Sequence, residues 1–145
     1  MPLLNYTTKV PVSQSIREIT ASLVRGGASS IMQDYDSDGV IVSISFRLKL
    51  QDNIIDFKLP SDFRAVQQIL IDDRVERSFR TPEHAQRVSW RITKDWVEAQ
   101  MALLATKSVT MPQLFLPYAV GKDGKTLYEQ IAINPSILLG SGEQL

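Results

Sequence analysis

The chain has 145 residues, enough for one domain with a buried core, and its 43% hydrophobic and 22% charged residues are typical of a globular protein. Sixteen basic and sixteen acidic residues give a net charge of zero, so no overall field attracts nucleic acid or an anionic membrane. The lack of cysteine excludes disulfides, thiolate metal sites and cysteine nucleophiles, and a single histidine excludes a multi-histidine metal site within one chain.

The sequence also lacks the usual signs of membrane insertion and export. No apolar run approaches the roughly 20 residues of a membrane span, and the first residues lack the basic-then-apolar pattern of a signal peptide. We therefore expect a cytoplasmic protein with no membrane partner.

The first part of the chain predicts a strand followed by a helix. Residues 3–12 are rich in β-branched and aromatic side chains, which favour an extended strand. Ser13 or Ser15 then caps a helix, and Ser15 with Glu18 has the spacing of a capping box. Two consecutive glycines at residues 26–27 predict the end of this helix.

Three further strands are predicted to follow. Residues 29–35 predict the first of them, and residues 36–39 have the composition of a turn. Residues 40–50 alternate so regularly that the second half of this strand has one apolar face and one basic or polar face. Residues 54–59 alternate in the same way. The pattern β-α-β-β-β therefore predicts an antiparallel sheet of about four strands.

Helices are predicted for most of the remaining chain. Ser61 or Asp62 can cap a short helix, and Thr81-Pro82 followed by an acidic residue is a start signal for a helix that runs to about Lys107. Another short helix is predicted at residues 126–131. The predicted fold class is α+β: residues 1–139 form a single domain in which packed helices follow the sheet, and residues 140–145 form a flexible tail.

The long helix has two apolar stripes on opposite sides. One stripe has three-and-four spacing and consists of Ala85, Val88, Ile92, Trp96, Ala99 and Leu103. The second lies roughly 150° away, whereas a helix packed on one side of a small domain needs one stripe. Its cover must come from another copy or from the apolar segment 114–118. We favour a homo-oligomer whose interface contains Trp90, Val97, Met101, Leu104, Phe115 and Tyr118.

A series of arginines precedes and enters this helix. Guanidinium groups bind phosphate through paired hydrogen bonds, so the series suits a nucleotide or a nucleic-acid backbone. Acidic residues are interleaved with it, and a solvated face of mixed charge is the alternative interpretation. The predicted ligand-binding residues are Arg74, Arg77, Arg80, Arg87 and Arg91.

Three other features suggest chemistry less strongly. Asp34, Asp36 and Asp38 match the first half of a calcium-binding loop, but the twelfth position is Ser45 instead of glutamate, which favours a polar turn and no metal site. Basic side chains on the polar face of the third predicted strand could contact nucleic acid, although the aromatic residues of the sheet point inward. His84 could act as a base, but no motif ties it to a nucleophile.

Three segments resemble small uncharacterised proteins of phages and integrated elements: residues 6–12 (YTTKVPV), 87–101 (RVSWRITKDWVEAQM) and 115–118 (FLPY). The resemblance implies an accessory role such as counter-defence, in which a compact oligomer binds a host protein or sequesters a nucleotide signal. It also implies a bacterial host cell as the location.

These observations predict a non-enzymatic small binding protein of phage or mobile-element origin. It is expected to self-associate and to bind a phosphate-bearing ligand such as a nucleotide, without a cofactor. The alternatives are a protein–protein inhibitor of a host factor, acting through segment 114–118 or the stripe at Trp90, and a nucleic-acid-binding accessory protein.

Overall fold

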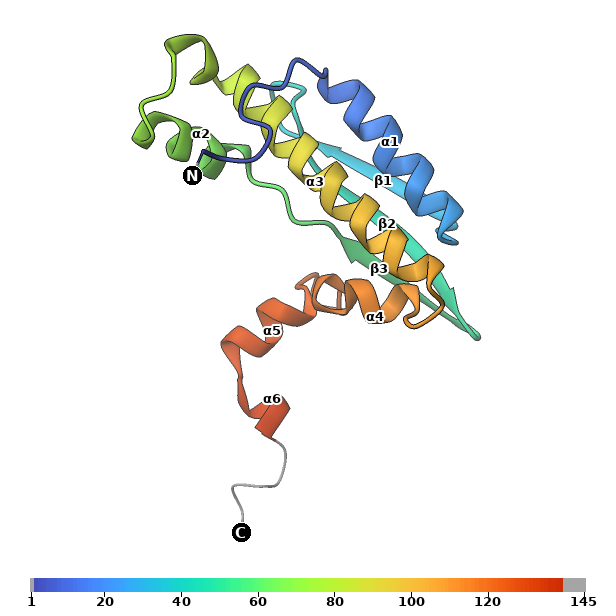
Figure 1. Cartoon of the computed structure of the whole chain (residues 1–145). Helices are drawn as coiled ribbons and strands as arrows, with labels where there is room; N and C mark the ends of the chain where they lie inside the picture. Colours follow the sequence, from blue (N-terminus) through green and yellow to red (C-terminus); the bar gives the residue numbers. More distant parts are fainter. Residues whose placement is uncertain (1, 140–145) are drawn as a thin grey trace.

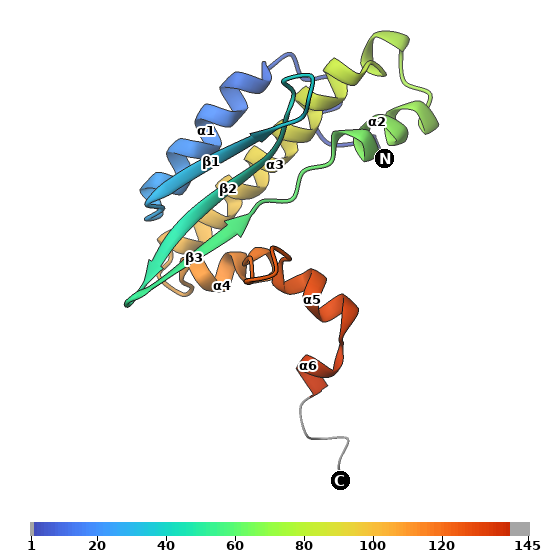
Figure 2. The same ribbon diagram turned by 180° about the vertical axis from the view of Figure 1, so that it is seen from behind.

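A three-stranded antiparallel sheet with two helices on one face forms the centre of the computed structural model, which describes residues 2–139 (Figure 1). The strands β1 (Ser30–Tyr35), β2 (Ile41–Leu50) and β3 (Asn53–Lys58) lie in that order across the sheet. Helices α1 (Val12–Arg25) and α3 (Pro82–Ala105) pack side by side on one face. Figure 2 shows the opposite face of the sheet in front of both helices. The predicted α+β class is confirmed.

The sheet buries the apolar face that the alternation of β2 predicts. Phe46 and Leu48 are at most 4% exposed, and the ring of Phe46 stacks on that of Phe57 in β3 with 5.2 Å between centroids. The register between β1 and β2 shifts after Asp34, so that Val42 is an extra residue in β2. This bulge buries Ile41 and leaves Val42 38% exposed.

The strand predicted at residues 3–12 is wrong, and the sheet has three strands instead of about four. Asn5 has a left-handed φ of 63°, and the amide of Tyr6 donates to the carbonyl of Leu3, which together form a turn. Leu3 and Tyr6 pack on α3 instead, and the Asn5 side chain donates to Asp95 at 2.7 Å. This segment therefore packs on the helices through Leu3 and Tyr6 instead of pairing in the sheet.

The helix starts are largely as predicted. Asp62 caps α2 (Phe63–Asp72), Thr81 caps α3, and Thr126 caps α5 (Leu127–Ile133) through a capping box with Glu129. The exception is α1, because its N-cap residue is Pro11 and Ser15 is buried in its second turn. The predicted capping box of Ser15 and Glu18 is therefore wrong.

Most of both stripes of α3 is covered from within the chain, and the exceptions are Ala99 and Leu103 near the end of the helix, which stay exposed. On one side, Ala85 and Val88 are fully buried with Leu70 of α2, and the N-terminal segment completes this cluster. On the other side, Trp90 and Val97 are each 1% exposed and join the main core beneath α1 and the sheet.

This internal cover corrects the predicted interface. Trp90, Val97 and Phe115 are at most 1% exposed, so they have no surface to offer a second copy. The other three predicted interface residues, Met101, Leu104 and Tyr118, are partly buried and pack on the core or on Trp96. The two apolar stripes of α3 therefore do not require a second copy of the chain to cover them.

The apolar segment 114–118 also packs inside the chain. It belongs to α4 (Met111–Phe115) and to the 3-10 helix η2 (Leu116–Tyr118). Phe115 meets Phe46 edge-on at 5.1 Å, and Trp96 meets Phe115 and Tyr118 at 5.5 Å each. The segment therefore closes the far end of the core.

After η2 the chain leaves the body of the molecule as an arm. We call α5 and α6 (Ser136–Leu139) the C-terminal arm, which points away from the sheet and its helices in both views (Figures 1 and 2). The predicted tail at residues 140–145 lies outside the described residues. Within residues 2–139, no helix combines the length and the apolar character needed to cross a membrane.

Replacing a buried residue of α3 tests the internal cover. We expect Trp90→Ala to lower the free energy of unfolding by about 3–5 kcal/mol, because it empties the core on one side of the helix. Leu103→Ala on the same helix is the control; this side chain is 46% exposed, and its loss should cost below about 1 kcal/mol. Urea unfolding measures both, and equal losses would contradict the packing described here.

Candidate functional site

The N-terminal segment and the start of α3 enclose the groove that we treat as the candidate site. The 3-10 helix η1 (Arg77–Phe79) forms its third wall, and the groove has a volume of about 510 Å³. This lies within the range of small-molecule sites. Its lining residues are Thr8, Lys9, Pro11, Val12, Ser78, Phe79, Glu83, His84, Gln86 and Arg87.

His84 forms a fixed part of this groove. It is 3% exposed, and its Nε2 contacts the carbonyl oxygen of Tyr6 while its Nδ1 lies 3.2 Å from Arg87 Nη2. A guanidinium can only donate and a carbonyl can only accept, so Nδ1 is the acceptor and Nε2 carries the proton. These contacts assign the neutral Nε2–H tautomer to His84.

Aromatic packing holds the same wall together. The ring of Phe79 lies 5.0 Å from that of His84 and meets the ring of Tyr6 edge-on at 5.8 Å. Three separate parts of the chain, namely the N-terminal segment, η1 and α3, are thereby fixed to one another. The groove is thus preformed on its aromatic side.

The charges around the groove favour an anion. Lys9 and Arg87 contribute two positive charges and Glu83 one negative charge. The positive end of the α3 dipole adds to this local excess, since Glu83 and His84 lie in its first turn. The overall charge of the chain is zero, so the positive character is local to this groove.

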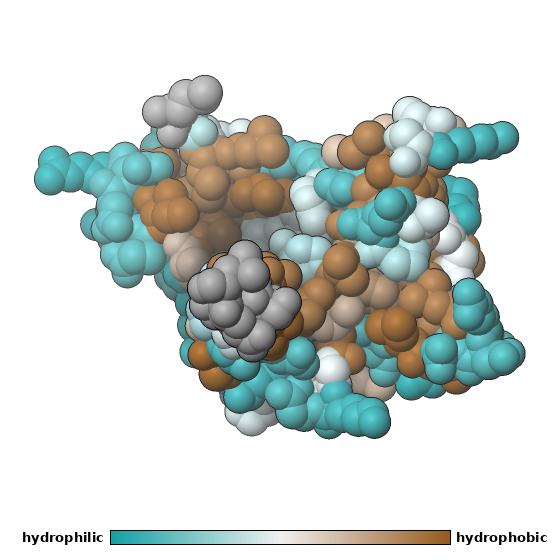
Figure 3. Space-filling model, turned by 90° about the horizontal axis from the view of Figure 1, so that it is seen from below, coloured by the Kyte–Doolittle hydropathy of each residue, from teal (hydrophilic) through white to brown (hydrophobic). Residues whose placement is uncertain are grey.

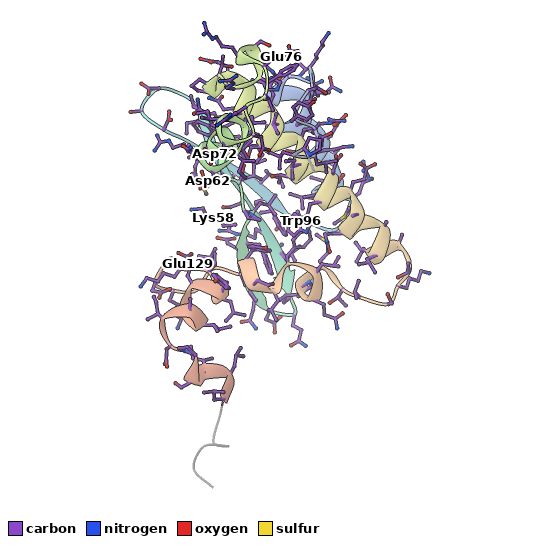
Figure 4. All side chains as sticks on the ribbon, turned by 60° about the vertical axis from the view of Figure 1, so that its left-hand side comes forward. Lys58, Asp62, Asp72, Glu76, Trp96 and Glu129 are labelled. Atoms are coloured by element: carbon purple, nitrogen blue, oxygen red, sulfur yellow. The ribbon has the colours of Figure 1, made fainter. Side chains whose placement is uncertain are left out.

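The structure does not bring the five predicted arginines together. Arg87 lines the groove, whereas Arg91 pairs with Glu18 of α1 and the guanidinium of Arg80 donates to the carbonyl of Val75. Arg74 and Arg77 are exposed in and beside the loop after α2. Asp72 and Glu76 flank this loop (Figure 4), so its charge is mixed.

Sequence reasoning missed Lys9 and Phe79 as groove residues. Lys9 was placed in a strand, and Phe79 stands alone between charged residues. Their proximity depends on where the N-terminal segment crosses α3, and no local pattern in the sequence encodes this crossing. The one sequence signal for this groove is that His84 and Arg87 are three residues apart at the start of the long helix, which places them on the same side of it.

The helix-free face of the sheet is the second basic surface that the sequence predicts. Arg47, Lys49 and Lys58 lie on this face, but Arg47 already pairs with Asp56 at 2.8 Å. The paired hydrogen bonds from Arg47 hold the pKa of the Asp56 carboxyl below its usual value. A shallow cavity of about 350 Å³ lies beside this pair.

The aspartates that resemble a calcium loop form a turn. Asp36 Oδ1 accepts hydrogen bonds from the amides of Asp38 and Val40, and Asp34 accepts one from the hydroxyl of Ser43. Gly39 has the positive φ of 79° that this turn requires. Across residues 2–139, no group of three or more histidine or acidic side chains converges in a way that could hold a metal ion.

The C-terminal arm exposes an unusual share of apolar side chains. Those at least half exposed are Tyr128, Ile133, Ile137, Leu138 and Leu139. Apolar residues also surround a hollow on the face of the molecule from which the arm projects (Figure 3). Exposed apolar patches of this kind mark sites of contact with other proteins.

Comparison with known proteins gives no match: no family model, no curated protein and no solved structure is similar to this chain.

The pair of Arg47 and Asp56 predicts a pH effect on stability. Because the folded-state pKa of Asp56 is lowered, its contribution is present above the unfolded pKa of about 3.9 and is lost as the pH falls through the folded value. We expect Arg47→Met to lower the free energy of unfolding only slightly at neutral pH, since both side chains are over 40% exposed. The deficit should shrink as the pH falls below the unfolded pKa of Asp56.

Urea unfolding across this pH range measures the effect. Lys49→Met is the matched control, because Lys49 is exposed on the same face and its neighbour across the strands is Ile54. A deficit for Arg47→Met that stays constant with pH would show that the pair does not titrate as described.

Proposed function

We propose that the protein is a small non-enzymatic binding protein, an accessory protein of a phage or mobile element, whose groove binds a phosphate-bearing ligand such as a nucleotide. The observation that carries this proposal is the meeting of Lys9 and Arg87 at a preformed groove with an aromatic wall. The resemblance of residues 6–12 and 87–101 to phage proteins supports the accessory role, with counter-defence by nucleotide sequestration as one form of it.

Arg87 is the residue best suited to hold the phosphate. A guanidinium has five N–H donors in a planar fork, and the contact with His84 uses one of them. This contact also orients the fork, which lowers the entropy lost when a ligand binds. Lys9 can add a second positive charge from the N-terminal segment that lines the groove.

The surroundings of His84 support binding without catalysis. Its Nδ1 accepts from Arg87 and its Nε2–H donates to the backbone, so both ring nitrogens are engaged. A general base needs a free lone pair within reach of the substrate proton. The single histidine of the chain therefore has a structural role that orients Arg87.

Neutralising Arg87 tests the anion site. We expect Arg87→Gln to weaken binding of ATP or of inorganic pyrophosphate at least about tenfold, because a charged hydrogen bond contributes about 1.5–3 kcal/mol. Isothermal titration calorimetry measures the affinity, and Lys9→Gln should weaken binding in the same direction. Lys9 is exposed and lies outside the core, so its variant separates ligand binding from folding.

The matched control is Arg74→Gln, which removes the same charge from an exposed loop outside the groove. Its affinity for both probes should equal that of the unchanged protein. Equal affinities of all variants, or no binding of either probe to the unchanged protein, would overturn the anion site.

A second candidate function is binding of a host protein, and the exposed C-terminal arm favours it. Apolar side chains that cover no part of their own fold are typical contact residues in interfaces. The sequence predicts segment 114–118 and Trp90 for this role, but Phe115 and Trp90 are at most 1% exposed, and Leu116 is the one large apolar side chain of the segment that is half exposed. The arm is the surface in the described chain that now fits the role best.

Polar substitutions in the arm test this second function. We expect the double variant Ile137→Ser with Leu138→Ser to lose cross-links to its partner in cells, because it removes the exposed apolar contact surface. Cross-linking with mass spectrometry identifies both the partner and the linked residues. Leu4→Ser, which alters an equally exposed apolar residue elsewhere, is the control. Cross-links that persist in the arm variant would contradict this function.

A further inference from the structure

The two edges of the sheet differ in whether another part of the chain covers them. Beyond β3, the segment 119–120 runs antiparallel to the strand, and the amide of Val120 donates to the carbonyl of Asp56 at 2.8 Å. This contact covers the C-terminal part of the β3 edge. Strand β1 forms the opposite edge of the sheet, and within the described residues no strand pairs with its outer side.

The hydrogen-bond pattern shows which groups of β1 face outward. Leu59 donates to the carbonyl of Ile44, and Ser29 donates to that of Arg47, so the bonding direction of β2 alternates between β3 and β1. Ser43, Ser45 and Arg47 therefore bond toward β1, where their partners are Asp34, Met32 and Ser30. The backbone groups of the alternate residues, Ile31 and Gln33, point away from the sheet.

Apart from the bulge that β2 forms beside its last residues, strand β1 lacks the features that usually protect an exposed edge. Natural edges are blunted by proline, lysine or inward-pointing charge. The six residues of β1 (SIMQDY) contain neither proline nor lysine, and Asp34 is their single charge. Met32 and Tyr35 are each 58% exposed. An open, nearly uncharged edge of this kind is suited to pairing with another strand.

We propose that β1 pairs antiparallel with β1 of a second copy, about a twofold axis at Gln33, to form a continuous six-stranded sheet. This register places Gln33 opposite its own counterpart, so that the outward backbone groups of the two residues bond to each other. It also places Ile31 opposite Tyr35 of the second copy, an aromatic and β-branched pair that stabilises antiparallel sheets.

The same register explains why the occupant is a second copy. Asp34 is then opposite Met32, so the single charge of each edge never meets its equivalent. Gln33 and Tyr35 are exposed although they lie on the helix side, so α1 leaves room for another strand there. Val24 is 54% exposed and lies on the side of α1 that faces away from the ion pair between Glu18 and α3. It adds apolar surface beside the open edge of β1. This contact uses no groove residue and is independent of the anion site.

Hydrogen exchange on the full chain tests the register directly. Ile31 and Gln33 amides should exchange at least about tenfold more slowly at high than at low protein concentration, because pairing protects them. The amide of Met32 points into the sheet and should be protected at both concentrations. Sedimentation velocity over the same range should show a monomer–dimer equilibrium. A monomer throughout, or concentration-independent exchange at Ile31 and Gln33, overturns the proposal.

Charge reversal at the axis distinguishes this dimer from any other. Gln33→Lys and Gln33→Glu should each weaken the dimer at least about tenfold, since like charges would face each other. An equimolar mixture of the two variants should form a heterodimer. Gln68→Lys is the control, because Gln68 is equally exposed on α2. A dimer that persists in both separate variants lies elsewhere and overturns the proposal.

Disulfide cross-linking adds a positive readout, because the chain contains no cysteine. Directly opposed residues of a hydrogen-bonded antiparallel pair have Cα atoms about 5.5 Å apart, within reach of a disulfide. Gln33→Cys should therefore form covalent dimers on mild oxidation, whereas Ser37→Cys in the exposed turn should not. Equal yields from the two variants would contradict the proposed axis.

Discussion

The burial of α3 on two opposite sides is the constraint on which the rest of this structure depends. One side needs the sheet and α1, so the strands must lie with a single face toward the helices. The other side is covered by α2 and the N-terminal segment. Residues 3–12, whose composition favours a strand, therefore pack on the helices and do not join the sheet. The three-stranded sheet and the position of the groove both follow from this division of one helix between two clusters.

The groove arises from the same packing. The N-terminal segment must cross the first turn of α3 to cover Ala85 and Val88, and the crossing brings the carbonyl of Tyr6 onto His84. Once His84 donates there, its other nitrogen can accept from Arg87. A contact that stabilises the fold thus orients a guanidinium at the surface, and a chain with no net charge acquires a groove lined by two positive charges and one negative charge.

The sequence predicted what local patterns encode. Alternation in residues 40–50 and the caps at Asp62 and Thr81 identified β2 and the two helices, because each signal comes from neighbouring residues. Propensity was wrong at residues 3–12, where tertiary contacts with α3 outweigh it. It also could not show that Arg91 would pair with Glu18, a residue 73 positions earlier in the chain. Residues grouped into a candidate site by their charge alone can therefore lie in separate places once the chain has folded.

With the two-sided helix satisfied internally, the surfaces left for partners lie on separate parts of the described chain. The groove is at the start of α3, the arm leaves the body beyond η2, and the open edge of β1 is on the side of the sheet opposite β3 (Figure 1). Pairing of β1 would cover neither the groove nor the arm. A dimer would thus present two grooves and two arms, so that ligand binding, partner binding and self-association are compatible in one assembly.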